Sequence, residues 1–399
     1  MSLHVAVVGG GVGGLCLAQG LTRNGVSVSV HERDVTPTDR LQGYRLHLSP
    51  VGARALHECL PPELWERFVA TTGRGGDGFG FVDERLRRLL TVDNPADEPS
   101  RAHHSVSRIT LREVLLTGLE DVVEFGRRFT RYEHVDGRVT VHFADGTSTR
   151  CDVLVGADGA NSAVRAQYLP HAERVDTGIT AVAGKLPLTP RTRAWLPPQL
   201  LAHAHSVIPR AAAGMFLAPH EPADGYAMPA DDGYLMWAYA ADGLVLPPGR
   251  PLRDVVADAV AGWHPDLLRV VRESPHDSVS RWPIRTSVPV DPWPATTVTL
   301  LGDAIHSMTP MRGIGANIAL RDAMTLCRNL TEREPLDAVA DYERRMREYG
   351  FAAVTASLRS ARQFVSGNAL GRVAFKSVLR LFEAVPPLKR AAFRDHGLD

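Results

Sequence analysis

VTLLGDAIHSMTPMRGIGANIALRD, residues 298–322, is the stretch that decides the fold of this chain. Its apolar start predicts a strand that ends at Gly302. Gly313 and Gly315 then allow the backbone to approach a flat ligand closely, and apolar periodicity predicts a helix from about 316 to 330. The free N–H groups and the positive dipole end of that helix would face an anion. The stretch therefore predicts a ligand-binding turn at the end of a buried strand.

A second glycine-rich turn, VAVVGGGVGG, opens the chain at residues 5–14. A buried strand is expected before it, a helix after it, and then a strand that ends next to Glu32. Gly9, Gly11 and Gly14 have the G-x-G-x-x-G spacing, and an acid about 20 residues further on suits a ribose hydroxyl. This is the complete fingerprint of a dinucleotide-binding βαβ unit, but it does not separate FAD from NAD. Two such turns in one chain predict an extended cofactor that is held at both ends.

A third turn, VGADGANSAVR, lies at residues 155–165. A strand expected over residues 152–155 stops there, which is where an open α/β sheet binds its ligand, and a helix follows. Arg45 is expected on another strand, on the opposite face from Leu46. Its side chain could be solvated or could contact a ligand, and the sequence favours neither.

Residues 179–279 differ in character, with strand-like segments and many prolines. Each large, adaptable side chain there is explained by an ordinary core, but on one sheet face the group would line a pocket for a flat apolar ligand. The histidines have no metal-ligand spacing. No titratable residue of the region stands out as a base, so the sequence names no catalytic residue. The candidate pocket residues are Met215, Met228, Met236 and Trp237.

The composition indicates a folded protein without a signature for nucleic acid or membrane. Hydrophobic residues make up 44% and charged residues 23% of the 399, and the formal net charge is zero with the basic residues scattered. No apolar run reaches the roughly 20 residues that span a bilayer, and strand-like sequence from Leu3 leaves no room for a signal peptide. We therefore expect a cytoplasmic protein. Its four cysteines form no metal or redox motif, and we expect buried free thiols.

Together the three turns resemble the signatures of single-component FAD-dependent aromatic hydroxylases, the flavoprotein monooxygenases founded on the para-hydroxybenzoate hydroxylases. The matching runs are VVGGGVGG with Glu32, VGADGANSAVR, and LLGDAIHSMTPMRGIGAN. The similarity in layout extends through nearly the whole chain, and the helix YERRMREYG makes it closest to the tetracycline-inactivating monooxygenases. The family commonly has Ala-Ala before His306 and Gln between the two distal glycines, where this chain has Ile305 and Ile314. These differences change side chains more than backbone donors.

The resemblance also implies roles for individual residues. The first turn would bind the ADP half of FAD, the Asp158 turn would serve FAD and the nicotinamide, and Asp303 would accept from the ribityl chain. Arg108 would contact the flavin side, and Arg45 falls where relatives have a residue near the flavin. The residues implied to bind cofactor are Gly9, Gly11, Val12, Gly13, Gly14, Glu32, Arg33, Arg45, Arg108, Asp158, Gly159, Asp303, Pro310, Gly313, Gly315, Ala316 and Asn317.

An α/β fold is implied, with a Rossmann-like FAD-binding domain, a mixed-sheet substrate domain and C-terminal helices. We expect those helices to cap the FAD-binding domain and to end at Pro386-Pro387. The expected boundaries are 1–75, 101–175 and 280–330 for FAD, 76–100 and 176–279 for substrate, and 331–399 for the C-terminal segment.

The implied activity uses FAD, with NADPH or NADH as transient reductant and O2, to hydroxylate an aromatic or polycyclic small molecule in secondary metabolism. Oxygen would add to the flavin as a C4a-hydroperoxide. An epoxidase, a Baeyer-Villiger enzyme or a flavin reductase of the same fold would share these motifs, as would a non-catalytic flavin-binding protein. We expect no metal, no nucleic-acid partner and no membrane partner. The sequence leaves open the substrate and the choice between monomer and homodimer.

Overall fold

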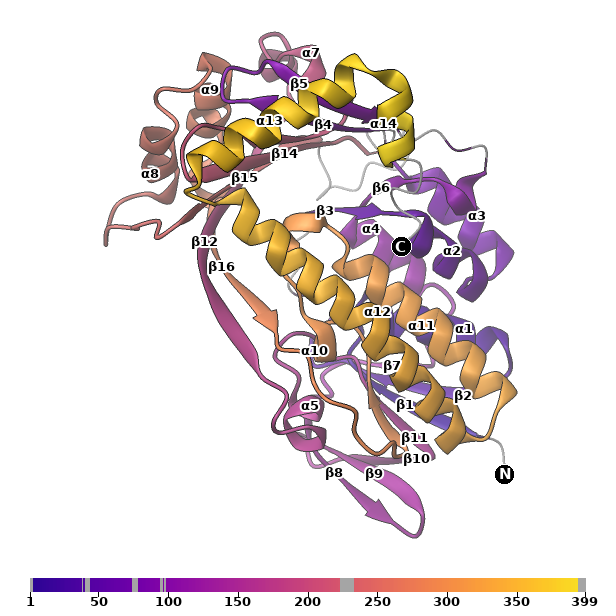
Figure 1. Ribbon diagram of the computed structural model, residues 1–399. Helices are drawn as coiled ribbons and strands as arrows, with labels where there is room; N and C mark the ends of the chain where they lie inside the picture. The colour runs from indigo at the N-terminus through magenta and orange to yellow at the C-terminus, as the bar shows by residue number, and fades with distance from the viewer. Residues whose placement is uncertain are drawn as a thin grey trace.

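The computed structural model describes residues 3–37, 39, 44–73, 78–93, 96, 98–222 and 233–393. Two layered parts lie one above the other, and the long helix α12 runs diagonally from the lower part to the upper (Figure 1). The lower part is built on a parallel sheet and the upper part on a larger mixed sheet. The predicted α/β fold class, with a parallel sheet, a mixed sheet and C-terminal helices, is confirmed.

The parallel sheet places side by side the three strands that precede the glycine-rich turns. Its order is β17 (Val298–Leu300), β11 (Val153–Gly156), β1 (His4–Val8), β2 (Ser27–His31) and β7 (Val123–Glu124). The central strands are almost wholly buried because helices cover the sheet, as apolar parallel strands require. The covering helices and nearby short ones are α1 (Val12–Arg23), α2 (Pro50–Cys59), α3 (Pro62–Thr71), α4 (Arg108–Leu116), α5 (Ala163–Tyr168), α10 (Asp303–His306) and α11 (Gly315–Glu332).

Two small antiparallel sheets extend the lower part. One joins β8 (Phe129–Val135), β9 (Arg138–Phe143) and β10 (Ser148–Cys151) through tight turns, and the other pairs β3 (Arg45–Leu48) with β6 (His104–Ser107). In the second sheet Arg45 lies opposite Ser107 and His47 lies opposite Ser105. This pairing brings together two segments that are about 60 residues apart in the sequence.

The upper part is a seven-stranded sheet with one covered face. Its order is β16 (Ser280–Ser287), β12 (Arg174–Pro187), β15 (Tyr234–Asp242), β14 (Ala213–His220), β13 (Ala204–Ile208), β4 (Gly78–Asp83) and β5 (Arg88–Asp93). Core residues of α8 (Leu252–Ala259) and α9 (Pro265–Glu273) pack with residues of this sheet. The shorter elements are α6 (Pro190–Arg193), α7 (Pro198–Ala202), and the 3-10 turns η1 (Pro99–Arg101), η2 (His276–Ser278) and η3 (Pro310–Arg312).

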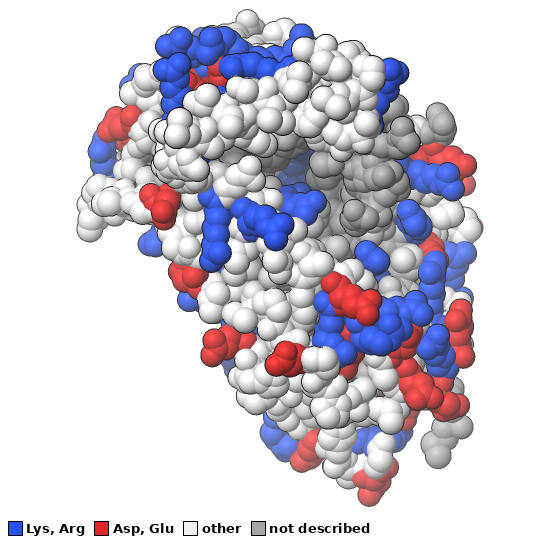
Figure 2. All heavy atoms as spheres, in the orientation of Figure 1, with Lys and Arg blue, Asp and Glu red and all other residues white. Residues whose placement is uncertain are grey.

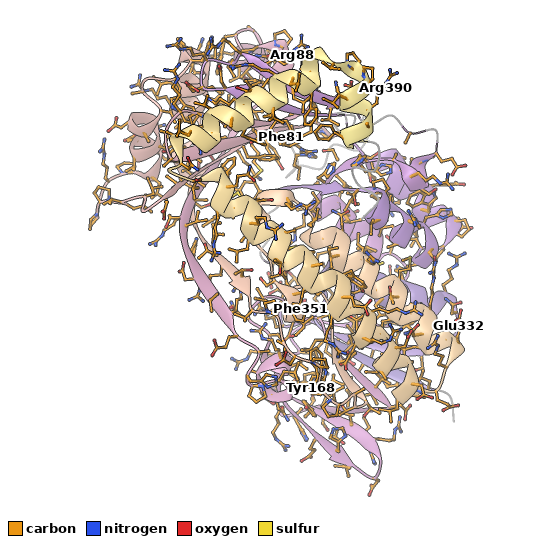
Figure 3. All side chains as sticks on the ribbon, viewed as in Figure 1. Phe81, Arg88, Tyr168, Glu332, Phe351 and Arg390 are labelled. Carbon is orange, nitrogen blue, oxygen red and sulfur yellow. The ribbon has the colours of Figure 1, made fainter. Side chains whose placement is uncertain are left out.

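The C-terminal helices do not all cap the dinucleotide-binding part, which corrects that expectation. Residues of α12 (Pro335–Phe364) join the lower core through Tyr342 and Met346. In contrast α13 (Ala369–Ala384) lies against β5, where Leu379 packs with Leu89 and Leu90, and Phe81 lies beneath it (Figure 3).

The chain also continues as a helix beyond Pro386-Pro387, where the sequence analysis expected the helices to end. The last described helix, α14 (Pro386–Phe393), begins at the first of these prolines. Proline is tolerated there because the first turn of a helix needs no N–H donor. Within the described residues, no helix combines the length and apolarity that a membrane crossing requires.

A buried arginine fastens the corner between α12 and α13 to the upper sheet. Arg372 Nη2 donates to Ala213 O at 2.6 Å and to Pro209 O at 3.1 Å, and its Nη1 donates to Phe364 O at 3.1 Å. Its side chain has no acidic partner at hydrogen-bond distance among the described residues, so backbone carbonyls alone satisfy it.

Arg372→Met should therefore lower the free energy of unfolding by on the order of 3 kcal/mol, because it leaves several buried carbonyls without donors. Urea unfolding followed by circular dichroism measures the change. Arg380→Met is the matched control on the same helix, since Arg380 is half exposed and only 3.9 Å from Asp83. Equal destabilisation by the two substitutions would contradict the assignment.

Candidate functional site

A single large cavity joins the two parts of the molecule. Its volume is about 2200 Å³, and it is lined by the glycine-rich turns on one side and by the seven-stranded sheet on the other. The hollow is visible between the two parts in Figure 2. Ordinary small-molecule sites occupy about 300–1,000 Å³, so this cavity has room for more than one ligand or for an extended one.

The first glycine turn packs against protein backbone on one side and faces the cavity on the other. A Cβ on Gly9 would lie 2.4 Å from Ala157 O, and one on Gly14 would lie 2.2 Å from Gly9 O, so neither position accepts a side chain. A Cβ on Gly11 would meet nothing within 4 Å, because its backbone faces the cavity at the start of α1. The turn therefore leaves its helix N-terminus accessible to a ligand.

Glu32 is held next to this turn by backbone donors. Gly10 N donates to its Oε2 at 2.6 Å and Asp34 N donates to its Oε1 at 3.0 Å. The side chain is 8% exposed and lines the cavity together with Arg33. The carboxylate keeps unused acceptor capacity on the cavity side, as a ribose hydroxyl would need.

The distal turn is braced by one buried carboxylate. Gly302, with φ 64°, lets the chain leave β17 and enter α10, and its N–H donates to Asp322 Oδ2 at 2.8 Å. The same oxygen lies 2.6 Å from His306 Nε2, and Tyr349 Oη donates to Oδ1 at 2.7 Å. Asp322 is 0% exposed, so three donors from three segments satisfy a fully buried charge.

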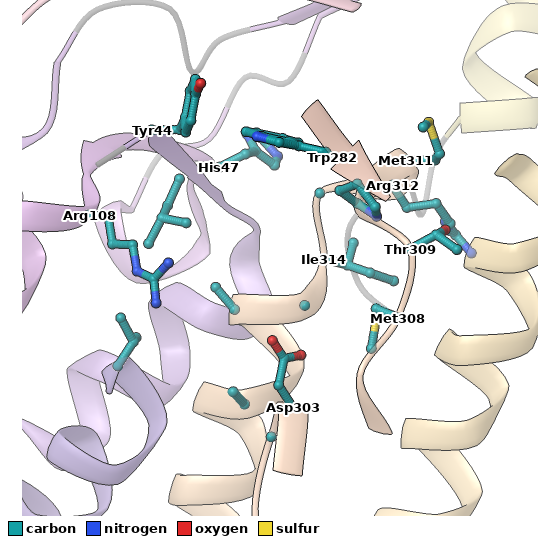
Figure 4. A pocket seen from close by; sticks show the side chains of 18 of the residues that line it. Tyr44, His47, Arg108, Trp282, Asp303, Met308, Thr309, Met311, Arg312 and Ile314 are labelled. Atoms are coloured by element: carbon teal, nitrogen blue, oxygen red, sulfur yellow. The ribbon is translucent and has the colours of Figure 1, made fainter. Parts of the chain in front are cut away.

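This network changes the pKa values of two groups. Burial alone would lower the pKa of His306, but Asp322 and Asp303 outweigh burial and the pKa is raised. For Asp303, burial raises the pKa against the opposing effect of His306 and Arg108. The Asp303 side chain has accessible surface only because it faces the cavity, where Arg108 points into the same space (Figure 4).

The Asp158 turn is tied into the same region. Asp158 Oδ2 accepts from Ala163 N at 2.7 Å and so caps α5, while Gly159 has φ 78°. Arg165 Nη1 donates to Ala304 O at 2.7 Å, which fastens α5 to the distal turn. The structure therefore brings all three sequence motifs to one cavity wall.

Asn317 is the exception among the predicted residues of the dinucleotide-binding part. It is 1% exposed and does not line the cavity. Its Oδ1 accepts from Ser49 N at 2.7 Å and its Nδ2 donates to His47 O at 2.9 Å. The Asn317 side chain therefore joins the start of α11 to the end of β3, which leaves the backbone of this residue for the predicted cofactor contact.

The predicted pocket residues of the upper sheet divide between its two faces. Met236 lines the cavity, with Phe216 on the neighbouring strand. The predictions for Met215 and Trp237 are wrong: both are 0% exposed in the core on the other face, and Trp237 Nε1 donates to Ser274 Oγ at 2.8 Å. Side chains alternate along a strand, so neighbours such as Met236 and Trp237 cannot share a face. Met228 lies outside the described residues.

A polar cluster forms where β3 pairs with β6: the sequence analysis named its Arg45 but did not single out its histidines. Arg45 Nε donates to Ser105 Oγ at 2.9 Å, its Nη2 is buried without a partner among the described residues, and burial lowers the pKa of Arg45 to about 10. His47 Nε2 and His103 Nδ1 lie 3.0 Å apart, and burial lowers the pKa of His47 to about 3. Arg45 and both histidines line the cavity. No sequence spacing signals these pairs, since strand pairing alone joins them.

In the described part of the chain, no group of three or more His, Cys, Asp or Glu side chains could hold a metal ion. The polar groups that line the cavity are instead backbone donors at helix starts, several arginines, and the carboxylates of Glu32, Asp34, Asp39, Asp158 and Asp303. That set suits an elongated organic cofactor with phosphate and ribose groups.

Comparisons with known proteins agree with this geometry. The model of a family described as an FAD binding domain matches residues 2–341. A 3-amino-4-hydroxybenzoate 2-monooxygenase from Streptomyces cremeus is 31% identical over 355 residues, which cover 86% of this chain and 82% of the relative. A crystal structure from Photorhabdus luminescens, described as that of an FAD containing monooxygenase, has a TM-score of 0.82 and 38% identity, and the match covers 91% of this chain and 99% of that one.

A longer fungal relative also matches. The dual O-methyltransferase/FAD-dependent monooxygenase of Phaeosphaeria nodorum is 31% identical over 369 residues, which cover 81% of this chain. The match covers only 40% of the fungal protein, so this chain spans less than half of that relative's length.

The raised pKa of His306 predicts a pH dependence of stability. A group whose pKa is higher in the folded state adds stability that is fully present below its unfolded value, about 6.5, and is lost as the pH rises through the folded value. The difference in urea midpoint between the wild type and His306→Gln should therefore be largest near pH 6 and shrink at higher pH. His134→Gln, at an exposed position of β8, is the control. A difference that grows with pH would show that the pKa is lowered instead.

Proposed function

This chain belongs to the FAD binding domain family, and we propose on that premise that it is an FAD-dependent monooxygenase. It uses NADPH or NADH and O2 to hydroxylate an aromatic or polycyclic small molecule, with a role in secondary metabolism. The observation that carries the proposal is the single cavity, which connects open glycine turns to an apolar sheet face. One end suits a dinucleotide and the other suits a flat substrate, so the two ligands would meet inside the protein.

The cavity wall of the lower part fits FAD. Gly11 leaves its helix start open, Glu32 presents a carboxylate, and Asp303 faces the same space as Arg108. At the distal turn a Cβ on Gly313 would meet nothing within 4 Å, so a flat ring system can approach the backbone. We propose that the cofactor is held by Gly9, Gly11, Val12, Gly13, Gly14, Glu32, Arg33, Arg45, Arg108, Asp158, Gly159, Asp303, Pro310, Gly313, Gly315, Ala316 and the backbone of Asn317.

A bound FAD would supply the redox chemistry that couples oxidation of the reduced nicotinamide to oxygenation of an electron-rich ring by O2. The residues of this chain supply binding, orientation and shielding. The N-terminus of α11 presents backbone donors and a positive dipole end to negative charge at the distal turn. Phe216, Met236 and Ala238 provide an apolar wall that excludes water from the reacting groups.

We also propose the domain boundaries that the sequence predicts. The FAD-binding domain is discontinuous, with residues 1–75, 101–175 and 280–330, and the substrate domain takes 76–100 and 176–279. The segment 331–399 would serve both, because α12 contacts the lower core and α13 contacts the upper sheet.

An aromatic substrate is supported by the apolar sheet face and by the name of the Streptomyces cremeus relative, a hydroxybenzoate monooxygenase. The direct test is NADPH oxidation and O2 uptake by the purified protein with a panel of phenols, indoles and polyketides. A true substrate should accelerate both and yield a hydroxylated product. A yellow protein that oxidises NADPH with none of them, and forms no product, would instead be a flavin-binding protein without this activity.

Two side chains test the cofactor assignment. Asp303→Ala and Arg108→Ala should each weaken FAD binding about tenfold or more, since each removes a charged hydrogen-bonding group that is worth about 1.5–3 kcal/mol. Flavin content after gel filtration measures this. The controls are Asp121→Ala and Arg54→Ala, both exposed and away from the cavity. Full FAD occupancy in both cavity variants would remove these residues from the site.

A glycine tests the cofactor space directly. Gly11→Val should fold normally, because a Cβ there meets no protein atom within 4 Å, yet it should lose FAD because the side chain enters the ligand's space. Gly262→Val is the matched control, since a Cβ on Gly262 is equally unobstructed and lies outside the cavity. If Gly11→Val kept its FAD, the proposed course of the cofactor past this turn would be wrong.

A further inference from the structure

Three arginines line the cavity next to the upper sheet. Arg359 and Arg362 come from the last turns of α12, and Arg312 comes from η3. All three are exposed, and within the described chain none of their side chains makes a hydrogen bond, an ion pair or a ring contact. Figure 2 shows basic side chains beside the hollow in this region. Earlier on α12, by contrast, Arg345 Nε lies 3.0 Å from Asp341 Oδ2.

Among the described residues that line the cavity, the upper sheet, α12 and α13 contribute no acid beside these arginines. The described lining residues contributed by the seven-stranded sheet are apolar or small, among them Phe79, Phe216, Met236 and Ala240. The lining residues from α12 and α13 include polar and basic side chains but no carboxylate. The fourth arginine of this wall, Arg372, already donates to backbone carbonyls. In the described part of the chain, one wall is therefore apolar, and the wall beside it carries positive charge without a paired carboxylate.

The segments that carry the three arginines are anchored to the sheet and to each other. The ring of Phe364 packs so close to Gly214 that a Cβ on that glycine would lie 2.4 Å from it. Thr309 Oγ1 donates to Ser357 O at 2.8 Å, which ties the segment before Arg312 to α12. The backbone positions that carry the three arginines are thus fixed beside the apolar wall, and their exposed side chains extend from there.

This arrangement has no explanation in the stability of the fold. Like charges repel one another, and unpaired exposed arginines contribute no ion pair that would offset the repulsion. A recess with low-dielectric walls concentrates the field of such charges and attracts anions of matching size. Guanidinium groups also suit carboxylates because two parallel N–H bonds fit the two oxygens.

We propose that the substrate is an aromatic or polycyclic acid whose ionised group is bound by Arg312, Arg359 and Arg362 while its ring system lies on the sheet face. This proposal rests on the proposed function and narrows its substrate class. The nicotinamide dinucleotide is a weaker candidate for these arginines, because the apolar sheet face beside them matches a ring system.

The test compares aromatic acids with their neutral amides. Salicylate with salicylamide, and a hydroxynaphthoate with its amide, are titrated into the FAD-loaded protein while the flavin absorbance is followed. Each acid should bind more tightly than its amide, and its affinity should fall as salt is added, because screening weakens charge attraction. In Arg359→Glu/Arg362→Glu the affinity for the acids should fall about tenfold or more, whereas the affinity for the amides should change less than about twofold.

Matched variants separate charge from structure. Arg359→Lys/Arg362→Lys should keep most of the affinity for the acids, since the charge stays. Arg54→Glu places the same kind of charge change at an exposed helix position away from the cavity. It should leave the affinities for both the acids and the amides unchanged. FAD content should be equal in all these proteins.

Three results would overturn the proposal. The first is that the charge-reversal variant loses affinity for the acids and for the amides to the same extent. The second is a variant that leaves acid binding intact but raises the KM for NADPH, which would assign the arginines to the phosphates of the reductant. The third is wild-type protein that binds the amides as tightly as the acids. A failure of the proposed function looks different, because FAD-loaded protein would then show these binding differences without ligand-stimulated NADPH oxidation.

Discussion

The buried carboxylate of Asp322 is the constraint on which the ligand-binding wall depends. A charge with no exposed surface is tolerated only when donors satisfy it, and here the donors are Gly302 N, His306 and Tyr349. These groups come from the end of β17, from α10 and from α12, while Asp322 itself is on α11. One side chain thus fixes where the strand turns, how Asp303 faces the cavity and how the long C-terminal helix lies on the sheet. This network therefore determines the geometry of the distal turn at which FAD binds.

The parts of the fold that sequence could predict are those with local causes. Gly9 and Gly302 have positive φ angles, and a Cβ on Gly14 would clash with Gly9 O five residues earlier, so these glycines mark the turns correctly. The assignment of both Met236 and Trp237 to one pocket was wrong. The sequence could have excluded it, because adjacent residues of a strand point to opposite faces of the sheet. The role of Asn317 could not be predicted, because its partners at the end of β3 are some 270 residues away.

Long-range pairing explains the other omissions. The contact of Arg45 with Ser105 and that of His47 with His103 arise only when β3 and β6 come together. The position of α13 on the upper sheet depends on a hydrophobic match with Leu89 and Leu90, which helical periodicity does not report. Periodicity predicts that a face is apolar but not which surface will cover it. Such sites are found once the topology is known.

The length of α12 has a consequence for how this protein can diversify. Its 30 residues form a rod about 45 Å long, anchored at one end by the lower core and at the other by the upper sheet. Inserting one residue would turn everything beyond it by about 100° and break the far anchorage. Changes of chain length are therefore confined to the loops, and new ligand preferences can arise on this rod only by exchange of one side chain for another.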